Sequence, residues 1–588
     1  MRFSPRIAGR RPLVVAAAAL AVVGGAGTAL AVGPLGDGDR SAELAAAIDS
    51  SKPRNVILLI GDGTDDSILT AARNYEYGAA GRLPALDALP FTGDMTTYGL
   101  KVGPGPDYPI AYVSDSAPTA SGWSTGKKTV DSRLSQGPST AGNVPGEDYE
   151  TALEILKAQG KRVGNVSTAA LTDATPAAAA SHINLRECQG PANMANCSSA
   201  RKVNGGKGSV AEQLVDNRID VLLGGGTARF AQATDAGPSV RQYAESAHDY
   251  TTVSDASGLA GVDTLANGPI LGLFANENMT PKYAPLVATA EGAGGNDARC
   301  ETADRGTQPS LAQMTSKAIE LLDNPKGFFL QVESAMVDKQ EHASDACGAI
   351  GDVAQLDEAT QAALDYQADH PDTLIIVTGD HGHSTQIVPN SASSGRFTTT
   401  LKTADGDPMT LAYSTATSTG GSMAHTGTQI RVAAKGPQAA NVTGLIDQTD
   451  IFQSLLGREP SELPKNTETV TTTVTTPATT VTAPAQPVTT PAAPAAPVAP
   501  RAAVTAASSI RRRALKASGL PVAVAASGAR TVTVELRRGS KRLVRKTVKA
   551  NGGTATLKAS TTPGALRVVV TARGAGGERT ASRTVRVR

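Results

Sequence analysis

Carboxylate and imidazole side chains gather in one part of this sequence at spacings that suit a metal ion. Asp338 and His342 are four residues apart, so on a helix they would share one face and reach one cation. Asp380 and His381 are adjacent, and His425 follows them. Mixed Asp and His ligands suit Zn²⁺, which accepts nitrogen and oxygen donors. A single histidine is more often an ordinary surface or core residue, but the pairing with carboxylates favours a metal site.

A second set of side chains offers only oxygen ligands. Asp62 stands between two glycines after an apolar run, Asp173 and Thr175 are two residues apart, and Glu333 ends another apolar run. Such hard oxygen donors suit Mg²⁺. The alternative is that these residues form turns and helix caps, which Asp and Thr often do.

Ser116 is the candidate nucleophile. It follows Asp115 and precedes a run of small residues that can begin a helix, whose N-terminus would stabilise an anion. Ser124 competes with it, because Gly122–Gly126 matches the G-x-S-x-G pattern of a nucleophile elbow. That elbow needs a preceding strand, and residues 117–121 are small and not strand-like. The sequence therefore favours Ser116.

The stretch Ser116–Ala120 is also a near match to the sulfatase pattern of Cys or Ser, any residue, Pro, any residue, Arg. Its fifth position is Ala120 where that pattern needs Arg, so conversion to formylglycine is not expected.

Short apolar runs alternate with helical patterns between residue 54 and about residue 457, which predicts an α/β fold with a central, largely parallel sheet flanked by helices. Strands are predicted at residues 54–60, 162–167, 220–223, 328–333, 374–378 and 429–434, and helices at residues 311–322 and 357–367. Several of these strands end in small or acidic residues. Because open α/β sheets bind ligands at the carboxyl ends of their strands, we expect one shared site there.

The first 31 residues are typical of an export signal, with a basic start, an apolar run and an Ala29-Leu30-Ala31 cleavage pattern. A membrane anchor is the alternative, and Arg10-Arg11 also permits twin-arginine export. No other stretch reaches the roughly 18 apolar residues that a membrane span needs. We therefore expect a secreted, periplasmic or cell-envelope protein.

Beyond the region predicted to be catalytic, at residues 50–460, the composition changes twice. Residues 464–508 are rich in Thr, Pro, Ala and Val, which predicts an extended linker. Residues 509–588 show short strands, with a hairpin turn expected at Asn551-Gly552-Gly553, and suggest a small, basic β-sandwich. This segment has about 19 Lys and Arg against two Glu. It predicts contact with anionic cell-envelope polymers, or else a solvated basic spacer.

The rest of the chain is acidic, which argues against nucleic acid as the main ligand. Four cysteines occur, at positions 188, 197, 300 and 347, and an even number in an exported chain suggests two disulfides. Of the three possible pairings, Cys188 with Cys197 is the natural local loop, which would leave Cys300 with Cys347. A four-cysteine zinc site is disfavoured because no C-x-x-C pair exists.

Eight separated motifs together resemble those of bacterial alkaline phosphatases, in the same order along the chain. They are Ile60–Gly63, Val113–Ala117, Trp123–Gly126, Asp173–Pro176, Gln331–Glu333, Asp338–His342, Thr378–His381 and His425–Gly427. The resemblance covers roughly residues 50–457 and implies hydrolysis of phosphate monoesters through a phosphoserine, with two zinc ions and one magnesium ion. It also implies a homodimer.

The resemblance assigns a role to each candidate residue. Ser116 would be the nucleophile, Arg186 would hold the phosphate, and Lys339 would contact it through water. Asp338, His342 and His425 would bind the first zinc, and Asp62, Asp380 and His381 the second. Asp62 would also bridge to magnesium, with Thr175 and Glu333 as direct ligands and Asp173 acting through water. His383 would orient a ligand without binding metal.

Two departures from the family pattern stand out. Thr64-Asp65-Asp66 replaces the usual Met-Gly-Asp, so Asp65 is expected to add a carboxylate near the site and alter metal affinity or pH optimum. Glu341 stands where Asp is common, a minor change. Two alternative functions remain: a phosphodiesterase or sulfatase on the same fold, and an inactive wall protein whose basic tail matters most.

Overall fold

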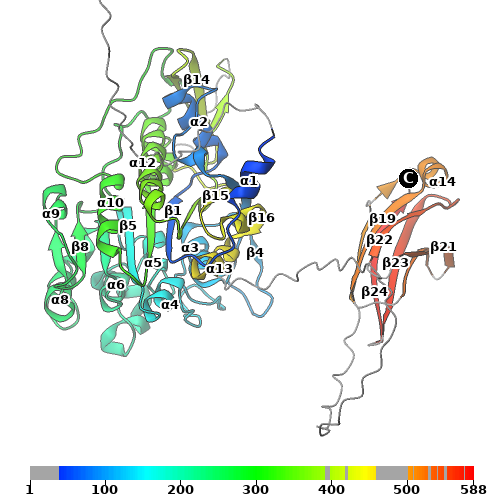
Figure 1. Ribbon diagram of the computed structural model, residues 1–588, viewed down its shortest axis with the longest axis horizontal. Coiled ribbons are helices and arrows are strands. Elements are labelled where there is room, and N and C mark those ends of the chain that lie inside the picture. Colours follow the sequence, from blue (N-terminus) through cyan, green and yellow to red (C-terminus); the bar gives the residue numbers. More distant parts are fainter. Residues whose placement is uncertain are drawn as a thin grey trace, which may run out of the picture. The chain divides into compact units, whose positions relative to one another are not determined.

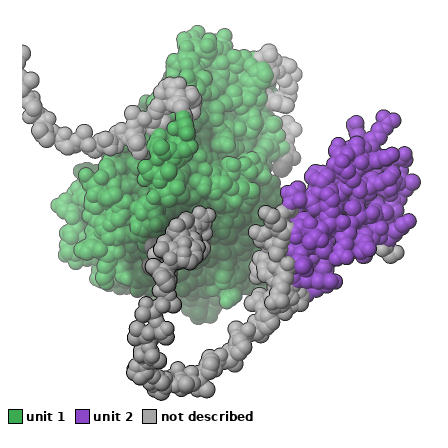
Figure 2. Space-filling view, turned by 45° about the vertical axis from the view of Figure 1, so that its right-hand side comes forward, with its two compact units in different colours: residues 1–467 green, residues 468–588 purple. Residues whose placement is uncertain are grey.

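The computed structural model describes residues 39–390, 397–416, 421–457, 501–506, 509–527, 531–539, 541–548, 552–574 and 577–587. The predicted export signal at residues 1–31 and most of the predicted linker lie outside these ranges. The chain divides into two compact units, residues 1–467 and 468–588, which Figure 2 shows in different colours.

A ten-stranded sheet forms the centre of the first unit (Figure 1). Its strands, in spatial order, are β16 (Gly444–Asp447), β2 (Phe91–Thr96), β15 (Ile430–Lys435), β11 (Thr373–Gly379), β1 (Asn55–Gly61), β10 (Phe328–Ser334), β5 (Arg162–Ala170), β6 (Val221–Gly225), β8 (Ile270–Leu273) and β7 (Thr251–Val253). From β11 to β7 all neighbours are parallel, whereas β15 runs antiparallel to both β11 and β2. The predicted largely parallel sheet is confirmed.

Helices cover both faces of this sheet. In chain order they are α1 (Ser41–Ala47), α2 (Asp66–Tyr77), α3 (Ser116–Thr125), α4 (Ala152–Ala158), α5 (Ala174–Ala178), α6 (Val210–Asp216), α7 (Thr227–Phe230), α8 (Val240–His248), α9 (Ala256–Ala260), α10 (Leu311–Leu322), α11 (Met336–His342), α12 (Ala346–Asp369) and α13 (Ile451–Leu456). Ten-residue α3 is buried along its whole length. Both helices predicted from periodicity exist, one as α10 and the other inside the longer α12.

Strand β1 shows why the fold has three layers. Its side chains alternate between the two faces of the sheet, as in any strand. Ile57 and Leu59 join the core beneath α2, α10 and α12, whereas Val56, Leu58 and Ile60 join the core beneath α3, α4 and α6. Since both faces are covered, the strand is apolar without interruption.

Smaller elements lie beside the central sheet. A four-stranded sheet has the order β12 (Gln386–Val388), β14 (Pro408–Tyr413), β13 (Phe397–Lys402) and β9 (Ala293–Gly294), and β3 (Gly99–Leu100) pairs with β4 (Ile110–Ala111). The two predicted disulfides are present, Cys188–Cys197 and Cys300–Cys347. Within the described ranges, no helix combines the length and apolar character that crossing a bilayer requires.

The second unit contains two sheets, antiparallel except where β18 pairs with β24 in parallel, and the short helix α14 (Arg512–Ala517). One sheet has β17 (Arg501–Ala506), β19 (Leu520–Ser527) and β22 (Gly552–Leu557). The other has β18 (Ser509–Ile510), β24 (Gly577–Val587), β23 (Gly564–Gly574), β20 (Thr531–Arg538) and β21 (Lys541–Val548). Leucine, valine and alanine side chains from both sheets form one shared core, which confirms the predicted β-rich C-terminal unit.

Two boundaries in this unit differ from the prediction. Residues 501–506, assigned to the linker, form β17 and pair with β19, because their small and β-branched residues can continue the sheet. Gly552 and Gly553, assigned to a turn, begin β22 and pair with Ala525 and Val524. Asn551 lies outside the described residues.

Candidate active site and metal centre

The carboxyl ends of three neighbouring parallel strands bring the candidate ligands together. Asp62 directly follows β1, Asp380 and His381 follow β11, and β10 leads into α11, which carries Asp338 and His342. The backbone fixes these loops to each other, since Asp338 N–H donates to Asp62 O at 2.9 Å and Gly63 N–H donates to Asp380 Oδ1 at 2.8 Å.

Gly63 permits this close approach. Its φ is +72°, and a Cβ there would lie 3.0 Å from the Cα and Cβ atoms of Asp338. A side chain would therefore be strained and would push α11 away from the end of β1.

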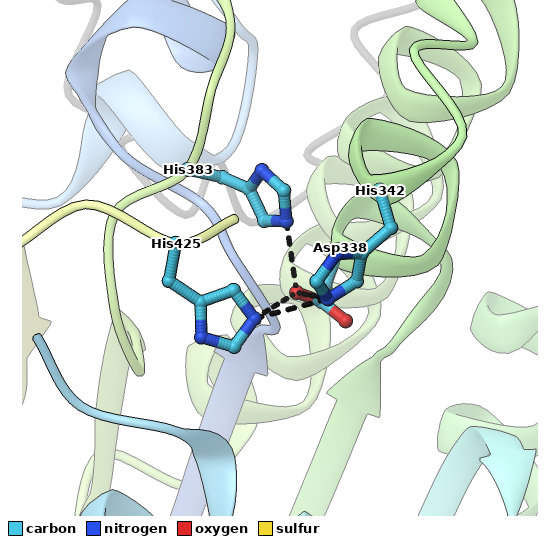
Figure 3. Close-up of side chains that lie close together, drawn as sticks. All are labelled: Asp338, His342, His383 and His425. Carbon is cyan, nitrogen blue, oxygen red and sulfur yellow. Dashed lines mark hydrogen bonds and ion pairs between the residues drawn. The ribbon is translucent and has the colours of Figure 1, made fainter. Parts of the chain in front are cut away.

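One group of ligands centres on the carboxylate of Asp338 (Figure 3). Its Oδ1 lies 3.3 Å from His342 Nε2 and 3.1 Å from His425 Nε2. The two histidine Nε2 atoms are 3.0 Å apart. Since two lone-pair nitrogens and a carboxylate oxygen point at one spot, the group can hold a cation such as zinc.

A second group adjoins the first and includes the candidate nucleophile. His381 Nε2 lies 3.4 Å from Asp62 Oδ1 and 3.3 Å from Asp380 Oδ2. Ser116 Oγ lies 3.4 Å from Asp62 Oδ1 and 3.3 Å from His381 Nε2. A hydroxyl that is far away in the sequence thus reaches the ligand cluster directly.

Hydrogen bonds fix which nitrogen of each of three histidines faces the cluster. In each case Nδ1 lies against a backbone carbonyl, to which it can donate, so Nε2 keeps its lone pair for a cation. The pairs are His342 with Met423 O, His381 with Gly382 O and His425 with Ser114 O.

His383 differs from these three. Its Nδ1 accepts from Ser384 N–H at 2.8 Å, so its proton is on Nε2. That nitrogen lies 3.3 Å from Asp338 Oδ1 (Figure 3). The distance alone would also let His383 bind a cation, but a protonated nitrogen cannot be a ligand. The two atoms meet as a close charge contact and not as a hydrogen bond, which fits a residue that faces Asp338 without binding the cation.

Three carboxylates of the cluster, those of Asp62, Glu333 and Asp380, are short of positive charge. Burial, and then repulsion from Asp338 and Asp380, raises the pKa of Asp62 well above its usual value. Burial is also the main reason why the pKa of Glu333 rises to about 8 and that of Asp380 to about 6. Buried carboxylates with raised pKa values that face one another are stabilised when cations lie between them.

Three of the atoms expected to bind metal have no hydrogen-bond partner among the described residues. They are Asp338 Oδ1, Asp380 Oδ2 and Thr175 Oγ1. Buried polar atoms are almost always partnered, so unpartnered atoms that coincide with the expected ligands suit the binding of cations. The residues present therefore fit the metal set that the sequence implies.

The oxygen-only set lies where β5 and β10 end. Ser167 Oγ donates to Glu333 Oε2, and Gln331 Nε2 donates to Thr175 O at 3.0 Å. Asp173 caps α5 by accepting from Ala174 N–H at 2.9 Å. Its carboxylate is already engaged by Arg186 and Lys339, so it suits contact with a cation through water more than direct binding.

Arg186 is partly buried between two carboxylates. One terminal nitrogen donates to both oxygens of Asp115, at 3.0 and 2.9 Å, and the other donates to Asp173. Burial alone would lower the pKa of Arg186, but these two carboxylates raise it well above its usual value. Because Asp115 directly precedes Ser116, it ties the guanidinium to the nucleophile's own loop. No role for Asp115 was predicted from the sequence, although its position beside Ser116 was a signal.

Lys339 lies among three carboxylates. Its Nζ is 3.1 Å from Asp338 Oδ2, 3.2 Å from Asp173 Oδ2 and 3.5 Å from Asp62 Oδ2. It also lines a cavity of about 460 Å³ together with His342, Val287, Phe397 and Met423. The cavity therefore adjoins the cluster at Lys339 and His342.

Ser116 is the first residue of α3, with Asp115 as the N-cap residue. Its hydroxyl therefore lies at the positive end of the helix dipole, where an alkoxide or phosphate is stabilised. Ser124 lies in the last turn of the same buried helix, with no strand before it, so it does not form a nucleophile elbow. The preference for Ser116 agrees with this geometry.

Asp65 has a structural role that the sequence analysis did not foresee. Its Oδ1 accepts from Ser67 N–H and Ile68 N–H, which caps α2, and its Oδ2 accepts from His383 N–H at 3.2 Å. Both oxygens are thus occupied, and the carboxylate does not point at the metal cluster as a ligand. Glu341 is also buried and accepts from Thr385 N–H at 3.3 Å.

Comparison with known proteins agrees with this site. The family model "Alkaline phosphatase" matches residues 53–419. The chain belongs to the alkaline phosphatase family. It is a metal-dependent phosphoric monoester hydrolase. Alkaline phosphatase H of Pseudomonas aeruginosa and alkaline phosphatase of Escherichia coli are each 46% identical to it; the matches cover 70% and 71% of this chain and 87% and 88% of theirs.

Two further similarities add detail. Streptomycin-6-phosphate phosphatase of Streptomyces griseus is 43% identical, over 68% of this chain and 89% of its own length. Among solved structures, Thermus thermophilus alkaline phosphatase matches with a TM-score of 0.52 at 21% identity, over 70% of this chain and 94% of that one. At that identity the match supports the fold alone.

Proposed function

We propose that the chain hydrolyses phosphate monoesters to an alcohol and inorganic phosphate through a covalent phosphoserine at Ser116. One observation carries this proposal: the Ser116 hydroxyl, at the N-terminus of α3, lies within 3.4 Å of Asp62 and His381. A reacting phosphorus beside that oxygen would also lie next to Arg186, which is held by the preceding residue, Asp115.

The same site is proposed to hold two zinc ions and one magnesium ion. The ligand sets are Asp338, His342 and His425 for the first zinc, Asp62, Asp380 and His381 for the second, and Asp62, Thr175 and Glu333, with Asp173 through water, for magnesium. These ions would supply positive charge that favours the serine alkoxide and the leaving oxygen. The orphaned ligand atoms and raised carboxylate pKa values support this set.

The chain's own residues bind and orient the phosphate. The guanidinium of Arg186 offers a planar fork to two phosphate oxygens, and Asp115 and Asp173 fix its direction. Lys339 adds a positive charge close to Asp62 and Asp338, and contacts phosphate through water. His383 holds Asp338 in position.

Two displacements complete the reaction. In the first, a bond forms between Ser116 Oγ and phosphorus while the bond from phosphorus to the alcohol oxygen breaks. In the second, water attacks the phosphoserine, phosphate leaves and the serine hydroxyl is restored. The proton that Ser116 loses in the first step is matched by the one that the alcohol gains. The N-terminus of α3 stabilises the serine oxygen in both steps.

We also propose that the protein is exported and acts as a homodimer, with its basic C-terminal unit contacting anionic envelope polymers. The two disulfides support an oxidising compartment. Apolar side chains exposed near Ser116 support association: Tyr112 is 78% exposed and Val113 is 48% exposed. Light scattering of the purified protein and fractionation of the source cells test these two points.

Three substrates separate this function from its alternatives. An aryl phosphate monoester should turn over far faster than the matching diester or sulfate. Mass analysis of peptides from protein quenched during turnover should find phosphate on Ser116 and not on Ser124. A faster diester or sulfate reaction, or no modified Ser116, would contradict the proposal.

A further inference from the structure

The five-stranded sheet of the second unit has one face that packs in the core and one that faces outward. Val532, Val534 and Leu536 of β20 are buried, so the residues between them point to the other face. The register of the neighbouring strands places arginines on that outward face. They are Arg537, Arg542, Arg545, Arg567, Arg573 and Arg586.

Three of these arginines form a row across three adjacent strands. Arg537 of β20 pairs with Arg542 of β21 on one side and with Arg567 of β23 on the other. Neighbouring strands are about 5 Å apart, so the backbone positions that carry these side chains repeat at that spacing. Arg545 of β21 is close to these three and lies opposite Glu535 of β20. We call Arg537, Arg542, Arg545 and Arg567 the arginine row.

The carboxylate within this row does not cancel its charge. Glu535 Oε2 accepts from Arg537, and Oε1 accepts from Arg542 and lies 3.8 Å from Arg545. The side chain of Glu535 is only 13% exposed, whereas those of Arg537, Arg542 and Arg545 are 38%, 52% and 49% exposed. Glu535 therefore orients the arginines from below, and the surface itself presents positive charge.

The chemistry of this face indicates its ligand. Each guanidinium has five N–H donors. Glu535 accepts from Arg537 and Arg542, and Ser582 accepts two bonds from Arg567, so most donors remain for an anion. Hydroxyls of Thr533, Thr571 and Ser582 add donors on the same face. A phosphodiester presents two unesterified oxygens, so one group can accept from guanidiniums on neighbouring strands.

The sequence also argues against nucleic acid on this face. No Phe, Tyr or Trp occurs after Phe452. Proteins that bind single-stranded nucleic acid stack the bases on aromatic side chains, and this unit has none to offer. A polymer recognised by its charges alone fits this surface better.

We propose that the arginine row binds a linear polymer that repeats a phosphodiester with no base, such as a polyol phosphate chain. This deepens the envelope contact put forward with the proposed function, and it is independent of catalysis by the first unit. Binding of the second unit to this polymer would hold the phosphatase at a phosphate-rich surface, where phosphate esters are released.

Binding of poly(glycerol phosphate) to the full chain tests this, with Ser116→Ala present so that the polymer is not turned over. The row variant carries Arg537→Gln, Arg542→Gln and Arg567→Gln. Its matched control carries Arg511→Gln, Arg579→Gln and Arg583→Gln, which remove the same charge from exposed positions off this face.

We expect the row variant to bind poly(glycerol phosphate) at least about ten-fold more weakly at low salt. The slope of its plot of log affinity against log salt should be smaller in magnitude by about 2, because three phosphate contacts are lost. The control should change affinity less than about three-fold. Thermal unfolding should show both variants folded. With Ser116 restored, both should hydrolyse an aryl phosphate at the unsubstituted rate, so a failure of binding is distinguishable from a failure of the proposed enzyme.

Other outcomes would overturn the proposal. Equal losses in the two variants would mean that net charge, and not this face, binds the polymer. Equal affinity for poly-L-glutamate would remove the preference for phosphate, and tighter binding of poly(dT) would favour nucleic acid. No binding to poly(glycerol phosphate) at low salt would end the idea.

Discussion

The two units of this chain use charged side chains in opposite ways. In the first unit, Asp62, Asp338 and Asp380 are almost completely buried, and oxygens of two of them have no partner. In the second unit, Arg537, Arg542 and Arg545 are exposed above a single shielded carboxylate. Buried anions of fixed geometry select small cations, whereas exposed cations on a flat sheet attract extended polyanions. In the proposed account, one chain thus combines a rigid site that suits metal ions with an open surface that suits a polyanion.

The largest effect should come from the nucleophile. Ser116→Ala should lower kcat for an aryl phosphate by at least about 10³-fold, because no other hydroxyl lies beside Asp62 and His381 in the described part of the chain. Ser124→Ala, in the same helix, should leave kcat within about two-fold and is the matched control. Near-normal kcat in the Ser116 variant would remove the covalent mechanism.

Next in size is the loss of a metal ligand. Asp338→Asn weakens the negative charge that His342, His383 and His425 surround, and should lower activity about 100-fold with loss of bound zinc.

Asp357 provides the control for this change, because it is a buried carboxylate away from the cluster. Its Oδ1 accepts from both Ala85 N–H and Leu86 N–H, and an asparagine keeps such an oxygen, so Asp357→Asn should change the free energy of unfolding by less than about 1 kcal/mol and leave the metal content unchanged. Zinc retained in the Asp338 variant would show that the cluster is not a metal site.

A smaller effect is expected at the phosphate-binding residue. Arg186→Lys replaces a planar fork held by Asp115 and Asp173 with a single ammonium group. The loss of a charged hydrogen bond should lower kcat/KM about 10- to 100-fold and weaken inhibition by inorganic phosphate similarly. Metal content should not change, and a loss of metal instead would show that Arg186 acts through the ligand cluster.

The smallest effect concerns a buried ion pair outside the site. His182 Nε2 lies 2.9 Å from Glu154 Oε1, and its Nδ1 lies 3.0 Å from Ser135 O. Burial alone would lower the pKa of His182, but the contact with Glu154 raises it above its usual value. Burial alone would raise the pKa of Glu154, but the contact with His182 lowers it.

The sign of the pH effect follows from these shifts. A raised histidine pKa stabilises the fold fully below the ordinary histidine value and loses this contribution as pH rises through the raised value. His182→Gln should therefore cost about 1 kcal/mol near pH 6 and clearly less near pH 9, measured by denaturant unfolding. His248→Gln is the control on a more exposed pair with Asp216. A cost in the His182 variant that is equal at both pH values would contradict the charged-pair account.

Much of the site could be predicted because its residues directly follow apolar strands. Asp62 and Asp380 directly follow β1 and β11, and Glu333 is the last residue but one of β10, so the neighbouring strands bring them together. The roles of Asp115 and Asp65 could not be predicted in this way. Asp115 holds Arg186, which is 71 residues away, and Asp65 uses both oxygens on backbone N–H groups, one of them from His383. Such contacts depend on tertiary structure that local patterns do not contain.

The limits of local pattern also appear in the second unit. Residues 501–506 have the same Ala, Thr and Val composition as the linker before them, yet they pair with β19 and cover a shared core. Composition therefore could not separate the end of the linker from the first strand.

Metal analysis of the purified full chain tests the central claim most directly. After dialysis, elemental analysis should find about two zinc ions and one magnesium ion per chain, and chelation should abolish aryl phosphate hydrolysis until zinc and magnesium are returned. Less than one bound ion per chain together with full activity in the chelator would contradict the account, because the buried carboxylates would then have no cation to stabilise them.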